Sequence, residues 1–229
     1  MRKFLIAVIV LVLLGAAADF VAARVFEDRV TTQLQREYDL GRRPVVQVRD
    51  FPFLPHLATG RFSTIDVAAT DASAKGINAA QLQLTLHDVR VPREVLLGEP
   101  GRITVDRADG TIELTEAEVN RLLADRLQGG SLAITESGVR VRVEVPLLGE
   151  ALVTGRLGAR EGAVSFTPEQ IRLGGREPLQ PALEDQLASR FSFQVPLPEL
   201  PAGVRLERVE TRPGTVVLSG RAAGVGVAA

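Results

Sequence analysis

Residues 81–87, with the sequence Gln-Leu-Gln-Leu-Thr-Leu-His, decide the fold because they alternate strictly between polar and apolar side chains. In an extended chain, Leu82, Leu84 and Leu86 share one face and the polar residues share the other. A strand with one apolar and one polar face is typical of an antiparallel sheet that covers a core on one side only. The sequence therefore predicts such a sheet as the framework of the protein.

The same period of two recurs over most of the chain. Turn pairs such as Asp109-Gly110, Ser137-Gly138 and Pro213-Gly214 separate the alternating segments, which indicates short antiparallel hairpins. The predicted strands cover residues 61–70, 81–87, 102–107, 110–114, 131–135, 139–145, 151–159, 163–166, 170–173, 204–211 and 215–219.

Two helices are predicted between these strands. Thr115 and Glu118 have the spacing of a capping box, and Val119, Leu122 and Leu123 follow on one helical face. The second helix begins at one of the prolines near residue 180 and carries a leucine at every fourth position (Leu179, Leu183, Leu187). The predicted class is α+β: a long, twisted, mainly antiparallel sheet with helices on its apolar face, preceded by an N-terminal apolar helix.

The N-terminal segment has the parts of an export signal. Two basic residues, Arg2 and Lys3, precede an apolar run over residues 4–18, and the small residues at 16–18 permit cleavage before Asp19. The apolar character resumes after Asp19, so residues 4–23 also reach the length of a membrane-spanning helix. A cleaved signal peptide and a retained anchor both fit, and either places the body of the protein outside the cytoplasmic membrane.

The predicted division of the chain follows from these patterns. Residues 1–23 are the signal peptide or signal anchor, and residues 24–43 are a helical stalk or packing helix that Gly41 and Pro44 terminate. Residues 44–222 form one α+β domain, and residues 223–229 form a disordered tail. We expect an exported protein of the periplasm or cell envelope.

Composition excludes several classes of function. The chain has no Cys, which removes disulfides, thiol catalysis and thiolate metal sites, and it has only two His. Its net charge of −1 gives no electrostatic basis for binding nucleic acid. No Gly-x-Ser-x-Gly motif places a nucleophile, and His87 fits a solvated strand position better than a catalytic one. We therefore expect no catalytic residue, no metal site and no cofactor.

Residues 51–57, with the sequence Phe-Pro-Phe-Leu-Pro-His-Leu, depart from the regular pattern. Their prolines argue against a regular helix or an inner strand, so a loop is predicted. Its aromatic side chains either plug one end of the sheet or form an apolar lip that admits a lipid or contacts a bilayer. Arg49 and Arg61 flank this segment and suit a phosphate group.

At these residues the chain resembles the LmeA-type phospholipid-binding proteins of actinobacteria. The resemblance runs over roughly residues 44–220. It is carried by residues 51–54 and 60–62, by the leucine strand with residues 89–92, by residues 109–112 with 115–123, and by residues 200–206 with Val209. It implies an envelope protein that binds phospholipid and supports glycolipid or lipoglycan assembly. It implies no particular site residues.

The leading hypothesis is a non-enzymatic protein that holds an acyl chain in an apolar groove. The predicted lipid-binding residues are Phe51, Phe53, Leu54, Phe62, Leu82, Leu84, Leu86, Val119, Leu122 and Leu123. In this hypothesis Phe51, Phe53 and Phe62 form the mouth, and Arg49 and Arg61 contact the headgroup. Phospholipid and the membrane surface are the predicted partners.

Two alternatives remain open at this point. The first is a scaffolding partner of membrane-embedded envelope glycosyltransferases, docked through the N-terminal helix. The second is a hydrolase that uses His87, for which the sequence offers less support.

Overall fold

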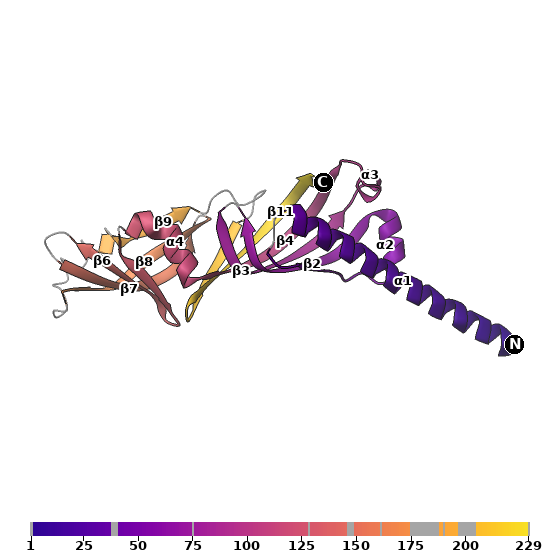
Figure 1. Ribbon diagram of the computed structural model, residues 1–229, viewed down its shortest axis with the longest axis horizontal. Helices are drawn as coiled ribbons and strands as arrows, with labels where there is room; N and C mark the ends of the chain where they lie inside the picture. Colours follow the sequence, from indigo (N-terminus) through magenta and orange to yellow (C-terminus); the bar gives the residue numbers. More distant parts are fainter. Residues whose placement is uncertain are drawn as a thin grey trace. The chain divides into compact units, whose positions relative to one another are not determined.

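The computed structural model describes residues 2–37, 41–74, 76–127, 129–145, 149–160, 162–174, 188–189, 191–196 and 205–228 (Figure 1). The helices are α1 (Arg2–Glu37), α2 (Phe53–Thr59), α3 (Arg93–Leu96) and α4 (Glu116–Leu127). The strands are β1 (Val45–Val48), β2 (Arg61–Ala74), β3 (Ile77–Arg90), β4 (Arg102–Thr115), β5 (Ser131–Thr135), β6 (Gly138–Val145), β7 (Gly149–Arg160), β8 (Ala163–Leu173), β9 (Phe193–Pro196), β10 (Arg205–Arg212) and β11 (Thr215–Ala228).

The strands form two sheets. One has six strands in the order β1-β2-β3-β4-β11-β10, and the other has five in the order β5-β6-β7-β8-β9. Pairing is antiparallel, with β1 aligned so that Val46 faces Val67 and β6 aligned so that Val141 faces Val153. The predicted α+β class, the antiparallel pairing and the N-terminal apolar helix are confirmed, but the strands are divided between two sheets instead of one.

The chain separates into two compact units. Unit 1 contains residues 1–70, 83–109 and 222–229, and unit 2 contains residues 71–82 and 110–221. Each unit contains a part of strands β2, β3, β4 and β11, and the single domain expected over residues 44–222 stays a prediction. Strand β11 continues to Ala228, so residues 223–228 pair in a sheet where a disordered tail is predicted.

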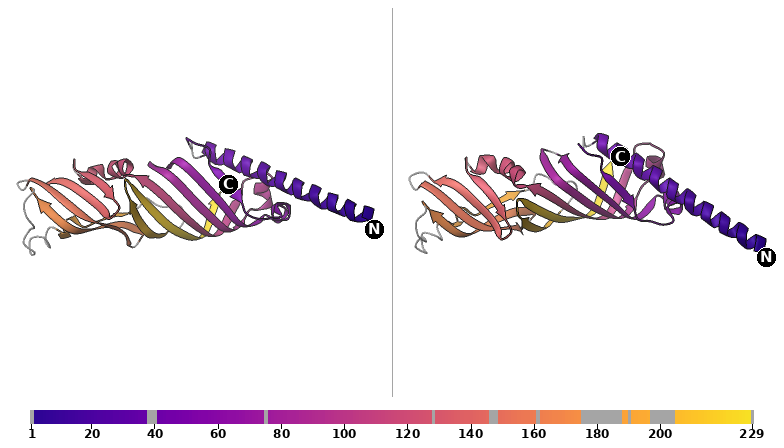
Figure 2. Two further views of the ribbon diagram at one scale, coloured as in Figure 1. Left: turned by 90° about the horizontal axis from the view of Figure 1, so that it is seen from below. Right: turned by 60° about the horizontal axis from the view of Figure 1, so that its bottom comes forward.

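Helix α1 belongs to unit 1 and has two different halves. The apolar side chains of its first half are exposed, as shown by Leu11 at 71% and Leu14 at 63%. From Asp19 onward one side of the helix is covered, and Ala22, Phe26, Val30 and Leu34 pack on the core of the unit. All views show the first half extending free of the remainder of unit 1 (Figure 2).

The same helix satisfies the length and composition of a membrane span. Residues Ile9–Gln35 contain the candidate span, with a mean hydropathy of 2.2. Among the described residues this is the one helix that meets both criteria. The helix continues without a break through Ala18 and Asp19, where the sequence permits cleavage.

The five-stranded sheet of unit 2 shows the predicted alternation in its burial. On β6, Val139 and Val141 are buried while Arg140 and Arg142 are exposed. Ala151 and Val153 continue the buried face on β7, and both are fully inaccessible. Burying branched aliphatic side chains in this way contributes roughly 1.5–3 kcal/mol for each large residue.

Helix α4 covers the edge strand β5 of that sheet. The Asn120 side chain accepts from the Leu132 backbone N–H at 2.8 Å and donates to the Leu132 carbonyl at 2.7 Å. A Glu116 carboxylate oxygen accepts from the Ile134 N–H at 2.8 Å. An exposed edge strand is a template for aggregation. These side chains bond three of its backbone groups, and the Ile134 carbonyl accepts from the Gly214 N–H at 3.0 Å.

Glu118 ties α4 to strand β3. Its buried carboxylate accepts from the Asn78 backbone N–H at 2.8 Å and from the Arg121 Nε at 2.8 Å. The hydrogen bond from Arg121 is the largest cause that lowers the pKa of Glu118 to about 2, and the Asn78 donors add to it against desolvation. Arg121 also donates to the Gly76 carbonyl, so the pair fixes the start of β3 against the helix.

The predicted capping box at α4 is half formed. The Glu118 N–H donates to Thr115 Oγ1 at 3.2 Å, as the motif requires. The Glu118 side chain does not complete the box, because it is engaged by Asn78 and Arg121. Tertiary contacts thus replace the local reciprocal bond.

Two further predictions meet different outcomes. The turn predicted at Asp109-Gly110 is wrong, because β4 runs without a break from Arg102 to Thr115. The helix predicted near residue 180, with Leu179, Leu183 and Leu187, lies outside the described residues.

The lowered pKa of Glu118 predicts a specific loss of stability in acid. A carboxyl group whose folded-state pKa lies below its ordinary value stabilises the fold above about pH 4.5 and loses that contribution as the pH falls through about 2. We expect Glu118→Gln to lower the free energy of unfolding at pH 7 by about 1–3 kcal/mol and to reduce its decline between pH 4.5 and 2. Urea unfolding of the detergent-solubilised chain measures this.

Glu169→Gln serves as the matched control, because Glu169 is exposed and pairs with Arg156 on the surface. An equal response of both variants across the acid range would contradict the role assigned to Glu118.

Candidate functional site

Residues 53–59 form the short helix α2, where the sequence predicts a loop. The prediction is wrong because Pro52 precedes the helix and Pro55 falls in its first turn, where a missing backbone N–H removes no intrahelical bond. Gly60 ends the helix in the left-handed conformation, with φ of 66°. A Cβ at this position would lie 2.1 Å from the Val91 carbonyl oxygen, so the close approach requires glycine.

The aromatic side chains of this region are divided between interior and surface. Phe53 and Phe62 are each 1% exposed. The Phe26 ring of α1 lies tilted against Phe53 at a ring-centroid distance of 5.4 Å and stacks with Phe62 at 5.6 Å. Phe51 is 76% exposed and Leu54 is 41% exposed. The trio Phe26, Phe53 and Phe62 therefore forms the core of unit 1, and the other two predicted residues of the segment face outward.

Asp19 holds α2 against α1. Its carboxylate is buried, with the residue 5% exposed, and accepts from the Phe53 N–H at 2.8 Å and the Leu54 N–H at 2.7 Å. The first N–H groups of a helix have no intrahelical acceptor, so this carboxylate satisfies two of them from a distant part of the chain. The negative charge at the helix N-terminus adds a favourable dipole interaction.

Two residues of this region, Asp19 and Phe26, are absent from the site predicted from the sequence. The pattern marks Asp19 as an interruption of an apolar run, and a charged residue in such a run signals a buried partner as readily as a cleavage point. Phe26 lies on the apolar stripe of the predicted helix. The sequence offers no signal for its pairing with Phe53 and Phe62.

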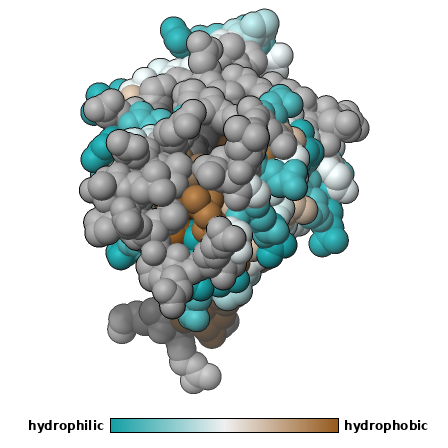
Figure 3. Space-filling view, turned by 90° about the vertical axis from the view of Figure 1, so that its left-hand side faces the viewer, coloured by the Kyte–Doolittle hydropathy of each residue, from teal (hydrophilic) through white to brown (hydrophobic). Residues whose placement is uncertain are grey.

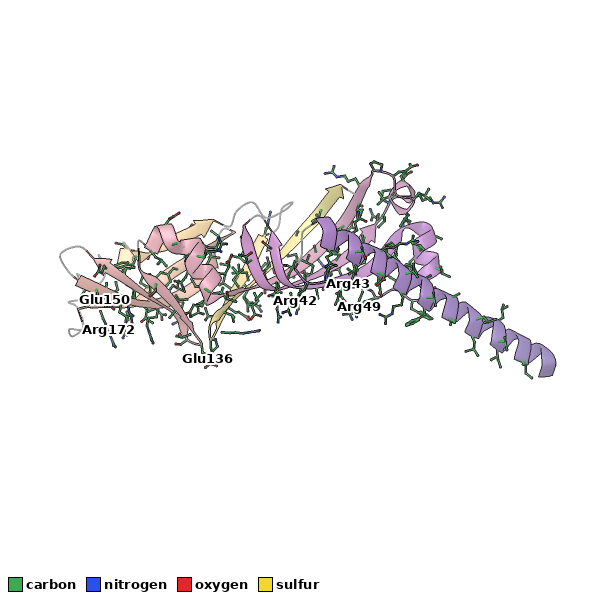
Figure 4. The ribbon with its side chains drawn as sticks, viewed as in Figure 1. Arg42, Arg43, Arg49, Glu136, Glu150 and Arg172 are labelled. Carbon is green, nitrogen blue, oxygen red and sulfur yellow. The ribbon has the colours of Figure 1, made fainter. Side chains whose placement is uncertain are left out.

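The two predicted headgroup arginines differ in their surroundings. Arg49 pairs with Asp66, which also accepts from Thr85 Oγ1 at 2.9 Å. Figure 4 shows Arg49 together with Arg42 and Arg43, which precede β1 in the chain. The Arg61 side chain is exposed, and its backbone carbonyl lies 2.9 Å from His56 Nδ1.

The leucine row of β3 is only half buried. Leu82, Leu84 and Leu86 all keep part of their surface accessible, and Leu86 packs against the core of unit 1. Asp88, at φ of 52°, shifts the alternation by one residue, so that Val89 becomes buried at 2% exposure. Leu84 and Leu86 belong to unit 1 and Leu82 to unit 2.

Helix α4 presents its three predicted residues in two directions. Val119 and Leu123 are buried at 9% and 7% exposure. Leu122 is 41% exposed. Among the described residues of unit 2, it is the one large hydrophobic residue that is exposed. Figure 3 views the molecule from the left-hand side of Figure 1. It shows apolar atoms at the centre of that face and hydrophilic side chains toward its margins.

The structure thus brings together Phe53, Phe62 and Leu86 in unit 1, and it brings together Val119 and Leu123 in unit 2. The arrangement of the two sets around one acyl chain stays a prediction. Surface that remains apolar and accessible is contributed by Phe51, Leu54 and Leu122 and by the leucine row of β3.

The titratable groups that the structure describes form ion pairs and no metal cluster. His87 Nε2 lies 3.1 Å from Asp109 Oδ2, and Arg107 Nε lies 3.4 Å from the same oxygen. Within the described ranges, no group of three or more His, Cys, Asp or Glu residues has the arrangement of a metal site. The neighbours of His87 are those of a surface ion-pair network.

Comparison with known proteins gives one match. A family model described as LmeA-like phospholipid-binding matches residues 17–221, which include parts of both units. No curated protein and no solved structure matches the chain.

The Asp19 contacts predict a measurable loss of stability. Asp19→Ala removes the acceptor of two backbone N–H groups at the start of α2 and leaves them in a buried environment. We expect the free energy of unfolding to fall by about 1–3 kcal/mol. Urea unfolding of the detergent-solubilised chain, followed by circular dichroism, measures the change.

Asp28→Ala is the matched control on the same helix. Its carboxylate is exposed and bonds Arg43 at 2.7 Å on the surface. A loss of stability as large as that of Asp19→Ala would show that the two buried hydrogen bonds carry no special weight.

Proposed function

Because this chain belongs to the LmeA-like phospholipid-binding family, we propose that it is a non-enzymatic phospholipid-binding protein of the cell envelope. The observation that carries the proposal is the extent of the family match, which includes residues of both units and residues 17–37 of α1. The family is one of phospholipid-binding proteins and not a known family of enzymes.

The accessible leucines supply the chemistry for an acyl chain. Leu82, Leu84 and Leu86 are half buried on one strand, and Leu122 is exposed on α4. Apolar surface removed from water by a lipid tail contributes roughly 25 cal/mol for each Å². We propose that each unit has acyl contacts of its own, Leu84 and Leu86 in unit 1 and Leu82 and Leu122 in unit 2. In unit 1, Arg61 and Arg49 would lie near the phosphate.

The N-terminal helix supports a location at the membrane. Its first half exposes a continuous apolar surface, and the basic residues Arg2 and Lys3 precede it. Under the positive-inside rule this orientation leaves unit 2, and unit 1 apart from the first half of α1, outside the cytoplasmic membrane. We propose that α1 is retained as an anchor and that the protein binds lipid at the outer surface of that membrane.

A role in envelope glycolipid or lipoglycan assembly follows as a further part of the proposal. A protein that withdraws a phospholipid at the outer surface is suited to work beside membrane-embedded glycosyltransferases that use lipid-linked substrates. The partner in that arrangement is a glycosyltransferase, and the anchor α1 places both proteins in one membrane.

Replacement of Leu122 by glutamate tests the lipid contact. Since Leu122 is 41% exposed, Leu122→Glu leaves the buried core of unit 2 unchanged but places a charge against the proposed acyl chain. We expect a several-fold loss of phospholipid retained by the full chain after purification in detergent. Native mass spectrometry counts the retained lipid molecules.

Val45→Glu is the matched control, because Val45 is 55% exposed and lies outside the proposed acyl contacts. Both variants keep α1, so lipid bound around that helix contributes equally to the two counts. Equal retention by the two variants would remove Leu122 from the site. A wild-type chain that retains no phospholipid would refute the proposed function.

A further inference from the structure

Unit 1 carries an apolar surface that the lipid-binding proposal does not use. It consists of Phe20 on α1, Phe51 directly before α2 and Leu54 in the first turn of α2, and we refer to these three residues as the α1–α2 apolar surface. Their exposed fractions are 60%, 76% and 41%. Exposed large hydrophobic side chains commonly mark a site of interaction.

The two hydrogen bonds of Asp19 hold this surface together. Because the carboxylate accepts from the N–H groups of Phe53 and Leu54, the first turn of α2 lies at the same level along α1 as Asp19. The Phe53 side chain is buried in the core, where it stacks with Phe62 and lies tilted against Phe26. The start of α2 is therefore fixed at two points. Its exposed side chain Leu54 and the preceding Phe51 have a defined position along the axis of α1.

The length of the apolar run sets where that height falls in a bilayer. Residues 4–18 make about 15 residues of helix, or about 22 Å at 1.5 Å for each residue. The hydrocarbon core is about 30 Å thick and needs about 20 residues. Helix α1 reaches that length only when residues up to Ala23 enter the membrane, and this brings Asp19 and the bonded turn of α2 to the boundary of the outer leaflet.

The polar groups at this level suit an interface. The Asp19 carboxylate is 5% exposed and hydrogen-bonded, so it presents little charge to lipid. Arg24 begins the next turn, and its guanidinium lies 5.2 Å from the centre of the Phe20 ring. An arginine near the end of a membrane helix reaches the headgroup region, where its charge meets phosphate while the neighbouring ring stays in contact with lipid.

We propose that the α1–α2 apolar surface inserts into the outer leaflet that α1 crosses, with Asp19 as the positioning residue that sets its depth. The occupant of this surface is the lipid bilayer itself. The proposal rests on the membrane location proposed above and adds a second point of contact, which fixes the orientation of unit 1. A single membrane helix would leave unit 1 free to rotate and tilt. The helix and the inserted α1–α2 apolar surface together restrict both motions.

The absence of Trp from the chain makes a direct test possible. Full chain carrying Phe51→Trp is reconstituted into vesicles of phosphatidylcholine and phosphatidylglycerol, with and without bromine on the acyl chains. We expect the bromine to quench at least about half of the Trp emission, because the ring lies at the acyl boundary. Val45→Trp is the matched control, with 55% exposure at the far end of β1 from α2, and its emission should not change.

Flotation of the vesicles separates this proposal from the one it rests on. Protein that fails to float with the vesicles would refute the membrane anchor, and the α1–α2 apolar surface would lose its basis. Protein that floats but shows equal, weak quenching for Phe51→Trp and Val45→Trp would refute the insertion alone.

A second variant isolates the role of Asp19. Asn at position 19 has nearly the same size but one oxygen acceptor where the carboxylate has two. We expect Asp19→Asn combined with Phe51→Trp to float as before and to lose about half of the quenching, because one of the two contacts that fix the turn of α2 is weakened. Unchanged quenching would overturn the positioning role of Asp19. The insertion itself is tested by the quenching of Phe51→Trp alone.

Discussion

The carboxylate of Asp19 is the constraint on which unit 1 depends. It is buried, it lies within an apolar helix, and it accepts from two backbone N–H groups in another part of the chain. A buried carboxylate without such partners would be strongly unfavourable. Together with the Phe26, Phe53 and Phe62 contacts, these bonds make the second half of α1 a structural part of unit 1, where a detached stalk would make no such contacts.

Unit 2 is stabilised by a comparable arrangement. Buried or edge-facing polar side chains on α4 bond the backbone of strands: Glu118 bonds β3, and Asn120 bonds β5. The apolar residues left accessible around these cores, Leu122 and the leucine row of β3 among them, are the ones assigned to lipid in the proposed function. In both units, polar groups fix the backbone while part of the apolar surface remains free for a ligand.

Local periodicity made much of the fold predictable. Strict alternation in residues 81–87 and 139–145 identifies β3 and β6, and the Thr115 cap identifies α4. The sequence did not reveal α2, because the restriction that a proline imposes depends on its position within a helix. It did not reveal the division into two sheets either, because strand pairing is non-local. Among the candidate site residues, Phe53 and Phe62 are core residues of unit 1. Their contact with Phe26 could not be predicted, because the sequence leaves open whether residues 24–43 form a stalk or a packing helix.

The central claim is that α1 is both the membrane anchor and a structural part of the lipid-binding protein. The most direct measurement is the intact mass of the protein isolated from the membranes of its own host. Retention of residues 2–18 in the membrane fraction, with a mass close to the 24.6 kDa of the full chain, is the predicted result. A soluble protein that begins at Asp19 would contradict the claim.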